Sequence, residues 1–124
     1  MNFARTVFRI AGAYGVLVIF PLYFMEARMG VEYPPAITHA EYYYAFAGVT
    51  LVWQLLFFLV ARDPVRFRPV MVFCILEKLT LLPVVLLLAP AGRFPPQWLP
   101  ATGIDLLLGA LFYVAYRKTP PRAV

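Results

Sequence analysis

The chain has 124 residues, of which 63% are hydrophobic and only 14% are charged. A soluble domain carries about 25% charged residues, and a chain this short cannot bury so large an apolar surplus. These values exclude an ordinary soluble globule and predict one all-α, membrane-embedded domain over 1–124. The net charge of +5 comes from basic residues beside apolar runs, where they set topology, so we expect no nucleic-acid partner.

The first apolar run covers about 8–25 and follows the basic residues Arg5 and Arg9. Its end lacks the small-x-small cleavage pattern of a signal peptide, so we expect it to be retained as a transmembrane helix. Within it, Ala11 and Gly15 are four residues apart, a spacing that lets two helices approach closely.

The second run covers about 39–61, and its 42–61 part contains no charged residue. Just before it, Thr38 and Glu41 have the spacing of a capping box, which predicts a helix start there.

The third run covers about 69–89 and is long enough to cross a bilayer as one helix. Pro83 lies inside it and predicts a bend, because proline leaves the carbonyl four residues earlier without its donor. A bent helix is therefore expected in this part of the chain.

The fourth run covers about 102–118. Thr102 and Asp105 again have capping-box spacing, and the prolines at 95, 96 and 100 argue against an earlier helix start. We therefore expect a short fourth span.

Four such segments predict a four-transmembrane-helix bundle with up-down-up-down topology, because lipid tolerates only segments that satisfy their own backbone hydrogen bonds. Eight basic residues fall on one side of this topology and two on the other. By the positive-inside rule both termini should be cytoplasmic, in a bacterial-type inner (plasma) membrane. The eight residues are Arg5, Arg9, Arg62, Arg66, Arg68, Arg117, Lys118 and Arg122.

The adjacent charges Glu77 and Lys78 lie in the middle of the third run. A charge at membrane depth costs at least ~2.5–3.5 kcal/mol, so it needs a partner, a wet cavity or a function. We expect a Gln54–Glu77 hydrogen bond and an Arg9–Glu77 ion pair. Such a cluster either bonds one helix to another or forms a ligand, ion or proton site. Its predicted members are Glu77, Lys78, Gln54, Thr50, Thr80 and Arg9.

A second polar group is expected nearer the outer face, about one-third of the bilayer away from Glu77. Its predicted members are Asp105, Glu26, Glu41 and His39. Helix capping alone would also explain Asp105. One histidine without diagnostic spacing predicts no metal site, and Cys74 is expected to be a packing residue.

Three short segments carry a resemblance to a known family. They are Ala61-Arg62-Asp63-Pro64-Val65-Arg66, Leu76-Glu77-Lys78 and Asp105-Leu106-Leu107-Leu108-Gly109. With the four spans and the longer first outer loop, the chain resembles the small bacterial membrane proteins grouped as DoxX-like. The resemblance implies a four-helix membrane fold and no particular activity.

Three functions fit these patterns, and we find no catalytic motif and expect no cofactor. The first is a noncatalytic accessory subunit that contacts another membrane protein or a second copy of itself. The second is a binder or carrier of a small amphiphile (lipid, quinone or isoprenoid) that holds its head group with Glu77, Lys78 and Gln54. The third is a membrane enzyme with a lipid-like substrate. A binder should contain a cavity of a few hundred Å³ with Glu77 or Lys78 on its wall, whereas a structural subunit should be filled.

Overall fold

The computed structural model describes residues 2–122, and within that range it contains helices and no strand. Four segments are long and apolar enough to cross a membrane, namely Asn2–Phe24, Ala40–Arg62, Arg68–Leu88 and Pro96–Lys118. The predicted all-α bundle with four spans is therefore confirmed, and it is the pattern of a multi-pass membrane protein. The elements are α1 (Asn2–Ile19), η1 (Phe20–Phe24), α2 (Glu26–Glu32), α3 (Ala40–Arg62), α4 (Arg68–Lys78), α5 (Leu81–Leu88), η2 (Pro96–Trp98) and α6 (Leu99–Lys118).

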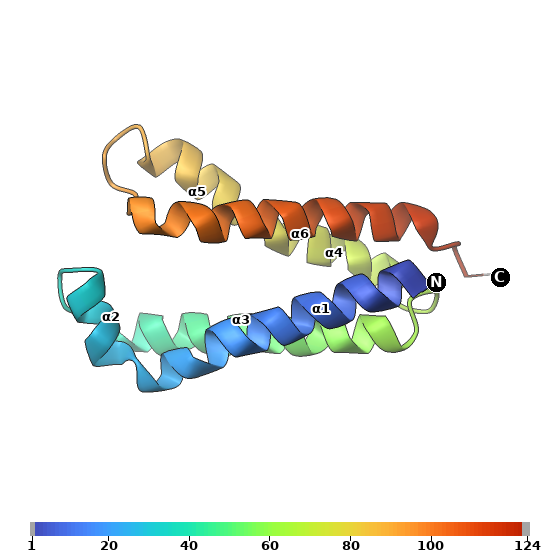
Figure 1. Ribbon diagram of the computed structural model, residues 1–124, viewed down its shortest axis with the longest axis horizontal. Helices are drawn as coiled ribbons and strands as arrows, with labels where there is room; N and C mark the ends of the chain where they lie inside the picture. Colours follow the sequence, from blue (N-terminus) through green and yellow to red (C-terminus); the bar gives the residue numbers. More distant parts are fainter. Residues whose placement is uncertain (1, 123–124) are drawn as a thin grey trace.

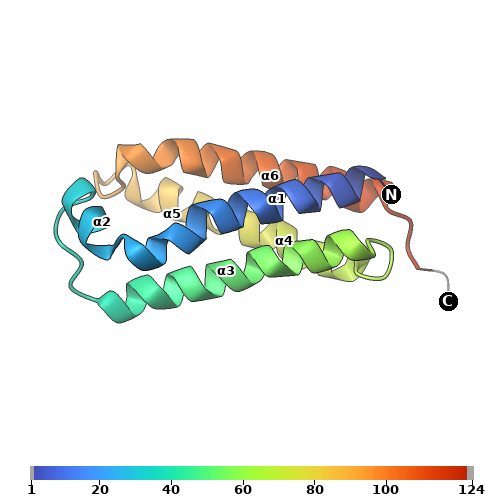
Figure 2. The ribbon, with the colours of Figure 1, turned by 60° about the horizontal axis from the view of Figure 1, so that its bottom comes forward.

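The helices run up and down the bundle (Figure 1). Both chain ends and the connection between α3 and α4 lie at one end, here called the terminal end, and α2 and the α5–α6 connection lie at the other, the loop end. Figure 2 shows α1 between α3 and α6, and it packs on both. The α4 helix packs mainly on α6 and touches α3 much less, and α5 packs chiefly on α6.

An aromatic core closes the terminal end. Phe8 stacks on Phe112 with ring centroids 4.3 Å apart, and Phe57 meets Phe112 edge-on at 5.0 Å. All three are fully buried, as is Cys74, which confirms its predicted role as a packing residue. Three of the spanning segments supply these rings, so the core joins α1, α3 and α6.

Arginine side chains also join the helices at the terminal end. Arg68 donates to the Thr119 carbonyl at 2.7 Å, and its guanidinium lies 3.9 Å from the centre of the Tyr116 ring. Arg5 donates to the Arg62 carbonyl at 3.0 Å. These carbonyls lie at helix C-termini, where acceptors lack helical partners and cations are favoured.

The loop end opens because the third span is broken. Between α4 and α5 the backbone tightens, with the Thr80 N–H bonded to the Glu77 carbonyl and the Leu82 N–H bonded to the Leu79 carbonyl. Pro83 has no N–H for Leu79, and its ring clashes with that carbonyl in a regular helix. The bend predicted from Pro83 is thus present four residues earlier, and α5 diverges from the α1–α3 pair (Figure 1).

The backbone of the first span makes a similar adjustment around Pro21. The α-helix ends at Ile19, and η1 continues as a tighter turn. Tyr43 donates its hydroxyl to the Leu22 carbonyl at 2.6 Å, which supplies a donor for this irregular backbone. The contact ties η1 to α3 at the loop end.

Several predicted helix limits were wrong. The first helix begins at Asn2 rather than near residue 8. The second begins at Ala40, one residue from its predicted start, but no side chain caps it, so the Thr38–Glu41 capping box was wrong. Before the third span, Asp63 accepts the Arg66 N–H within the turn that precedes α4.

The fourth helix also begins earlier than predicted, at Leu99 after η2. Pro100 does not prevent this, because the N–H groups of the first turn have no helical acceptor to lose. Thr102 is inside the helix, and its hydroxyl donates to the Trp98 carbonyl at 3.0 Å. The Thr102–Asp105 capping box was therefore wrong, and Asp105 lies inside α6.

We expect Phe112→Ala to destabilise the bundle by about 3 kcal/mol, at the low end of values for buried phenylalanines, because lipid removes part of the transfer term. Leu107→Ala is the matched control on the same helix, since Leu107 is 58% exposed. Thermal unfolding in detergent would measure both. Equal midpoints for the two variants would contradict the assignment of the core.

Candidate functional site: an ion triad on a cavity wall

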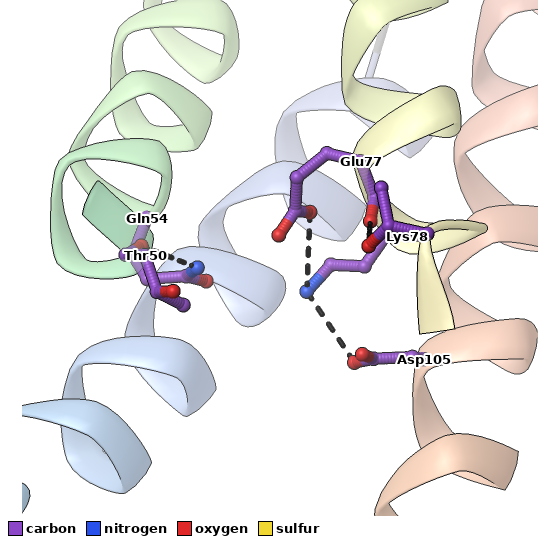
Figure 3. Close-up of polar contacts among 6 residues, drawn as sticks. Thr50, Gln54, Glu77, Lys78 and Asp105 are labelled. Atoms are coloured by element: carbon purple, nitrogen blue, oxygen red, sulfur yellow. Dashed lines mark hydrogen bonds and ion pairs between the residues drawn. The ribbon is translucent and has the colours of Figure 1, made fainter. Parts of the chain in front are cut away.

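Three charged side chains meet where α4 ends. The Lys78 ammonium lies 3.7 Å from Glu77 Oε2 and 3.5 Å from Asp105 Oδ1. Figure 3 shows the ammonium between the two carboxylates. We call Glu77, Lys78 and Asp105 the ion triad. It links α4 to α6, with the Lys78 side chain only 5% exposed.

Asp105 was expected at a different depth from Glu77, and that prediction was wrong. It followed from starting the fourth helix at residue 102. Because α6 begins at Leu99, Asp105 lies roughly 9 Å along the helix from its start, opposite the C-terminal end of α4.

The neighbours of Lys78 fix its position. Its Nζ lies 5.2 Å from the centre of the buried Phe57 ring, a distance at which a cation is attracted to the ring face. On the other side, α6 presents Gly109, where an added Cβ would lie 3.3 Å from the Lys78 Cβ. The glycine therefore allows α6 to approach α4 closely enough for Asp105 to reach Lys78.

A cavity of about 670 Å³ lies on the loop-end side of the triad, between the diverging helices. All three triad residues line it, together with Thr50 and Gln54 of α3. The rest of the wall is largely apolar and aromatic. The aromatic residues are Tyr14, Tyr33, Tyr43, Phe46, Trp53 and Trp98, which include both tryptophans of the chain.

Gln54 faces the triad from across the cavity (Figure 3). It is 1% exposed, and its Nε2 donates to the Thr50 carbonyl at 2.9 Å. Its Oε1 is buried and has no hydrogen-bond partner within residues 2–122. A Cβ on Gly15 would overlap the Gln54 amide, so this glycine makes the room for it. The close helix contact predicted at Gly15 is therefore present between α1 and α3, and it makes room for Gln54.

Neither of the two residues predicted to pair with Glu77 forms a hydrogen bond or ion pair with it. Gln54 bonds to its own helix, and no bond between it and Glu77 is present in the described chain. Arg9 is exposed. The buried Phe8 lies on the inner face of α1, and Arg9, one position further along the helix, therefore points outward. The predicted Gln54–Glu77 bond and Arg9–Glu77 pair were both wrong.

Thr80 and Thr50 were also expected in this cluster, and both line the cavity. The Thr80 hydroxyl donates to the Glu77 carbonyl at 2.7 Å. It therefore supports the break between α4 and α5 and orients the residue that carries the carboxylate.

The four residues of the predicted outer polar group do not lie together in the structure. His39 and Glu41 contact each other at 3.2 Å on the exposed surface, and Glu26 begins α2, whereas Asp105 belongs to the ion triad. Across residues 2–122, no three His, Cys, Asp or Glu side chains are grouped so that they could hold a metal ion.

Comparisons of the chain with protein-family models, with curated proteins and with solved structures give no match. The chemistry of the site is therefore inferred from its geometry.

Lys78→Met should be the most destabilising single change in the triad. It leaves two carboxylates facing each other with no cation, and removal of one member of a buried ion pair costs about 3–5 kcal/mol. Glu77→Gln and Asp105→Asn each leave one ion pair and should cost less.

The matched control is the triple variant that combines all three substitutions. It contains no buried charge, so it should recover most of the midpoint lost by Lys78→Met in a thermal unfolding experiment. A triple variant no more stable than Lys78→Met would show that the charges do not interact as described.

Proposed function

We propose that this protein binds or carries a small amphiphile taken from the bilayer. The head group would lie at the ion triad and Gln54, and the apolar tail along the aromatic wall. The observation that carries this proposal is a cavity of about 670 Å³ whose three charged side chains meet on one part of its wall. Pockets for small organic ligands commonly measure 300–1,000 Å³ and combine an apolar wall with a few polar groups.

The packing of the helices supports sideways access from the bilayer. The α4 helix touches α3 less than it touches α6, and α5 packs chiefly on α6. The α3 and α5 helices thus do not pack closely on each other, so the cavity is weakly walled between them. An amphiphile could enter there without leaving the membrane, and its tail would stay in apolar surroundings.

A role as an accessory subunit is the second candidate. The observation that favours it is that Lys78 is paired with both carboxylates inside the bundle. Such a network would fix α4 against α6 whether or not a ligand binds. The cavity beside the network favours the binding function over a purely structural one.

We also propose that the chain lies in a bacterial inner membrane with both termini in the cytoplasm, and that it is related to the DoxX-like proteins. The basic residues of the terminal end support this orientation. The motifs around Glu77 and Asp105 support the relationship.

The orientation can be tested in a Cys74→Ser background, because Cys74 is the only cysteine of the chain. Ala91→Cys places a thiol in the connection between α5 and α6, and Arg122→Cys places one in the C-terminal tail. A membrane-impermeant maleimide added to intact cells should label only the first. Labelling of the second alone would reverse the orientation.

The binding function is tested by native mass spectrometry of protein extracted gently from its own membrane. We expect a retained small molecule, and Leu81→Trp should remove it because Leu81 lines the cavity and the larger side chain would fill part of it. Leu87→Trp is the matched control on α5, since Leu87 is 74% exposed.

A small molecule kept by both variants would place it outside the cavity. A retained protein partner without any small molecule would favour the accessory role.

A further inference from the structure

We infer that the head group bound in the cavity is a hydrogen-bond donor without negative charge, such as an alcohol or an ammonium group. This inference rests on the proposed function and specifies its ligand class. It follows from two buried acceptors that have no partner in the described chain, and from the sum of the charges at the ion triad.

Within the described residues, the buried side-chain atoms of this wall that have no partner are both acceptors. Gln54 Oε1 is buried and has no hydrogen-bond partner in the described chain. Glu77 Oε2 is also buried, and the nearest ammonium is 3.7 Å away, beyond the 2.7–2.9 Å of a charge-assisted hydrogen bond. Asp105 Oδ1 has the same cation at 3.5 Å. A donor placed among these oxygens would supply bonds that they lack.

Three of the donors on this wall are already bonded within the protein. The Gln54 amide N–H is given to the Thr50 carbonyl, and the Thr80 hydroxyl to the Glu77 carbonyl. The Tyr43 hydroxyl is given to the Leu22 carbonyl. The Lys78 ammonium faces the two carboxylates at 3.7 and 3.5 Å, and its charge is offset there. A ligand that only accepts hydrogen bonds would leave the two buried acceptors without a partner.

The charges of the triad favour the same class. Two carboxylates and one ammonium leave a formal charge of −1 beside the cavity. A carboxylate or phosphate head group would add a like charge in a poorly solvated place, where repulsion is strong. A neutral alcohol avoids that repulsion, and an ammonium group balances the charge and can also rest on the aromatic wall.

The test compares four dodecyl amphiphiles that differ only in the head group: the alcohol, the primary amine, the carboxylic acid and the phosphate. Each is added to the purified full-length chain in detergent micelles at the same mole fraction. A mildly alkaline buffer keeps the acid ionised and the amine protonated. The thermal midpoint is the readout.

We expect the alcohol or the amine to raise the midpoint by several degrees, and the acid and the phosphate to raise it much less. Gln54→Leu should weaken binding of the effective compound by about tenfold, because it removes the unpartnered acceptor while keeping a side chain of similar size. Glu41→Gln is the control, because Glu41 is exposed and does not line the cavity.

The inference would be overturned if the acid or the phosphate raised the midpoint more than the alcohol and the amine did, and if Leu81→Trp removed this effect. The binding function would then still stand. An equal effect of all four compounds would also overturn it. If none of the four binds and the gently extracted protein retains no small molecule, the proposed function itself fails.

Discussion

The loop-end half of this protein depends on one constraint, the need to accommodate the Lys78 ammonium in the middle of a membrane span. An isolated charge there would be costly, and Glu77 on the same helix and Asp105 on α6 provide the compensation. The pairing holds α4 against α6, and Gly109 lets the two backbones approach. Because α4 is fixed in this way and the span breaks directly after it, α5 continues along a different line and leaves the cavity beside the triad.

The two ends of the bundle are consequently different in character. The terminal end is closed by the stacked rings of Phe8, Phe57 and Phe112 and by arginines bonded to helix ends. The loop end has irregular backbone at two prolines and a cavity lined with aromatic side chains. This division is what a binding protein requires, since regions that move or admit ligands have low local stability.

Much of the fold could be predicted from the sequence, because the length and apolarity of four segments are strong signals in a membrane protein. Glu77, Lys78 and Gln54 could be singled out because polar side chains stand out in apolar runs. The pairing of Asp105 with Lys78 could not be predicted, since it depended on where α6 begins and Pro100 was taken as a barrier. The cavity was also out of reach. Pro83 signalled a bend, but the direction of the bend depends on the packing of α4 against α6.

The most direct test of the central claim is a crystal structure of the protein grown from a lipidic phase, with the cavity between α3, α5 and the ion triad as the region of interest. We predict an elongated density in the cavity, with its polar end within hydrogen-bonding distance of Glu77, Asp105 or Gln54. A cavity closed by α5 packed against α3, with Gln54 bonded to Glu77 across the seam, would contradict the account and make the triad a device for helix packing.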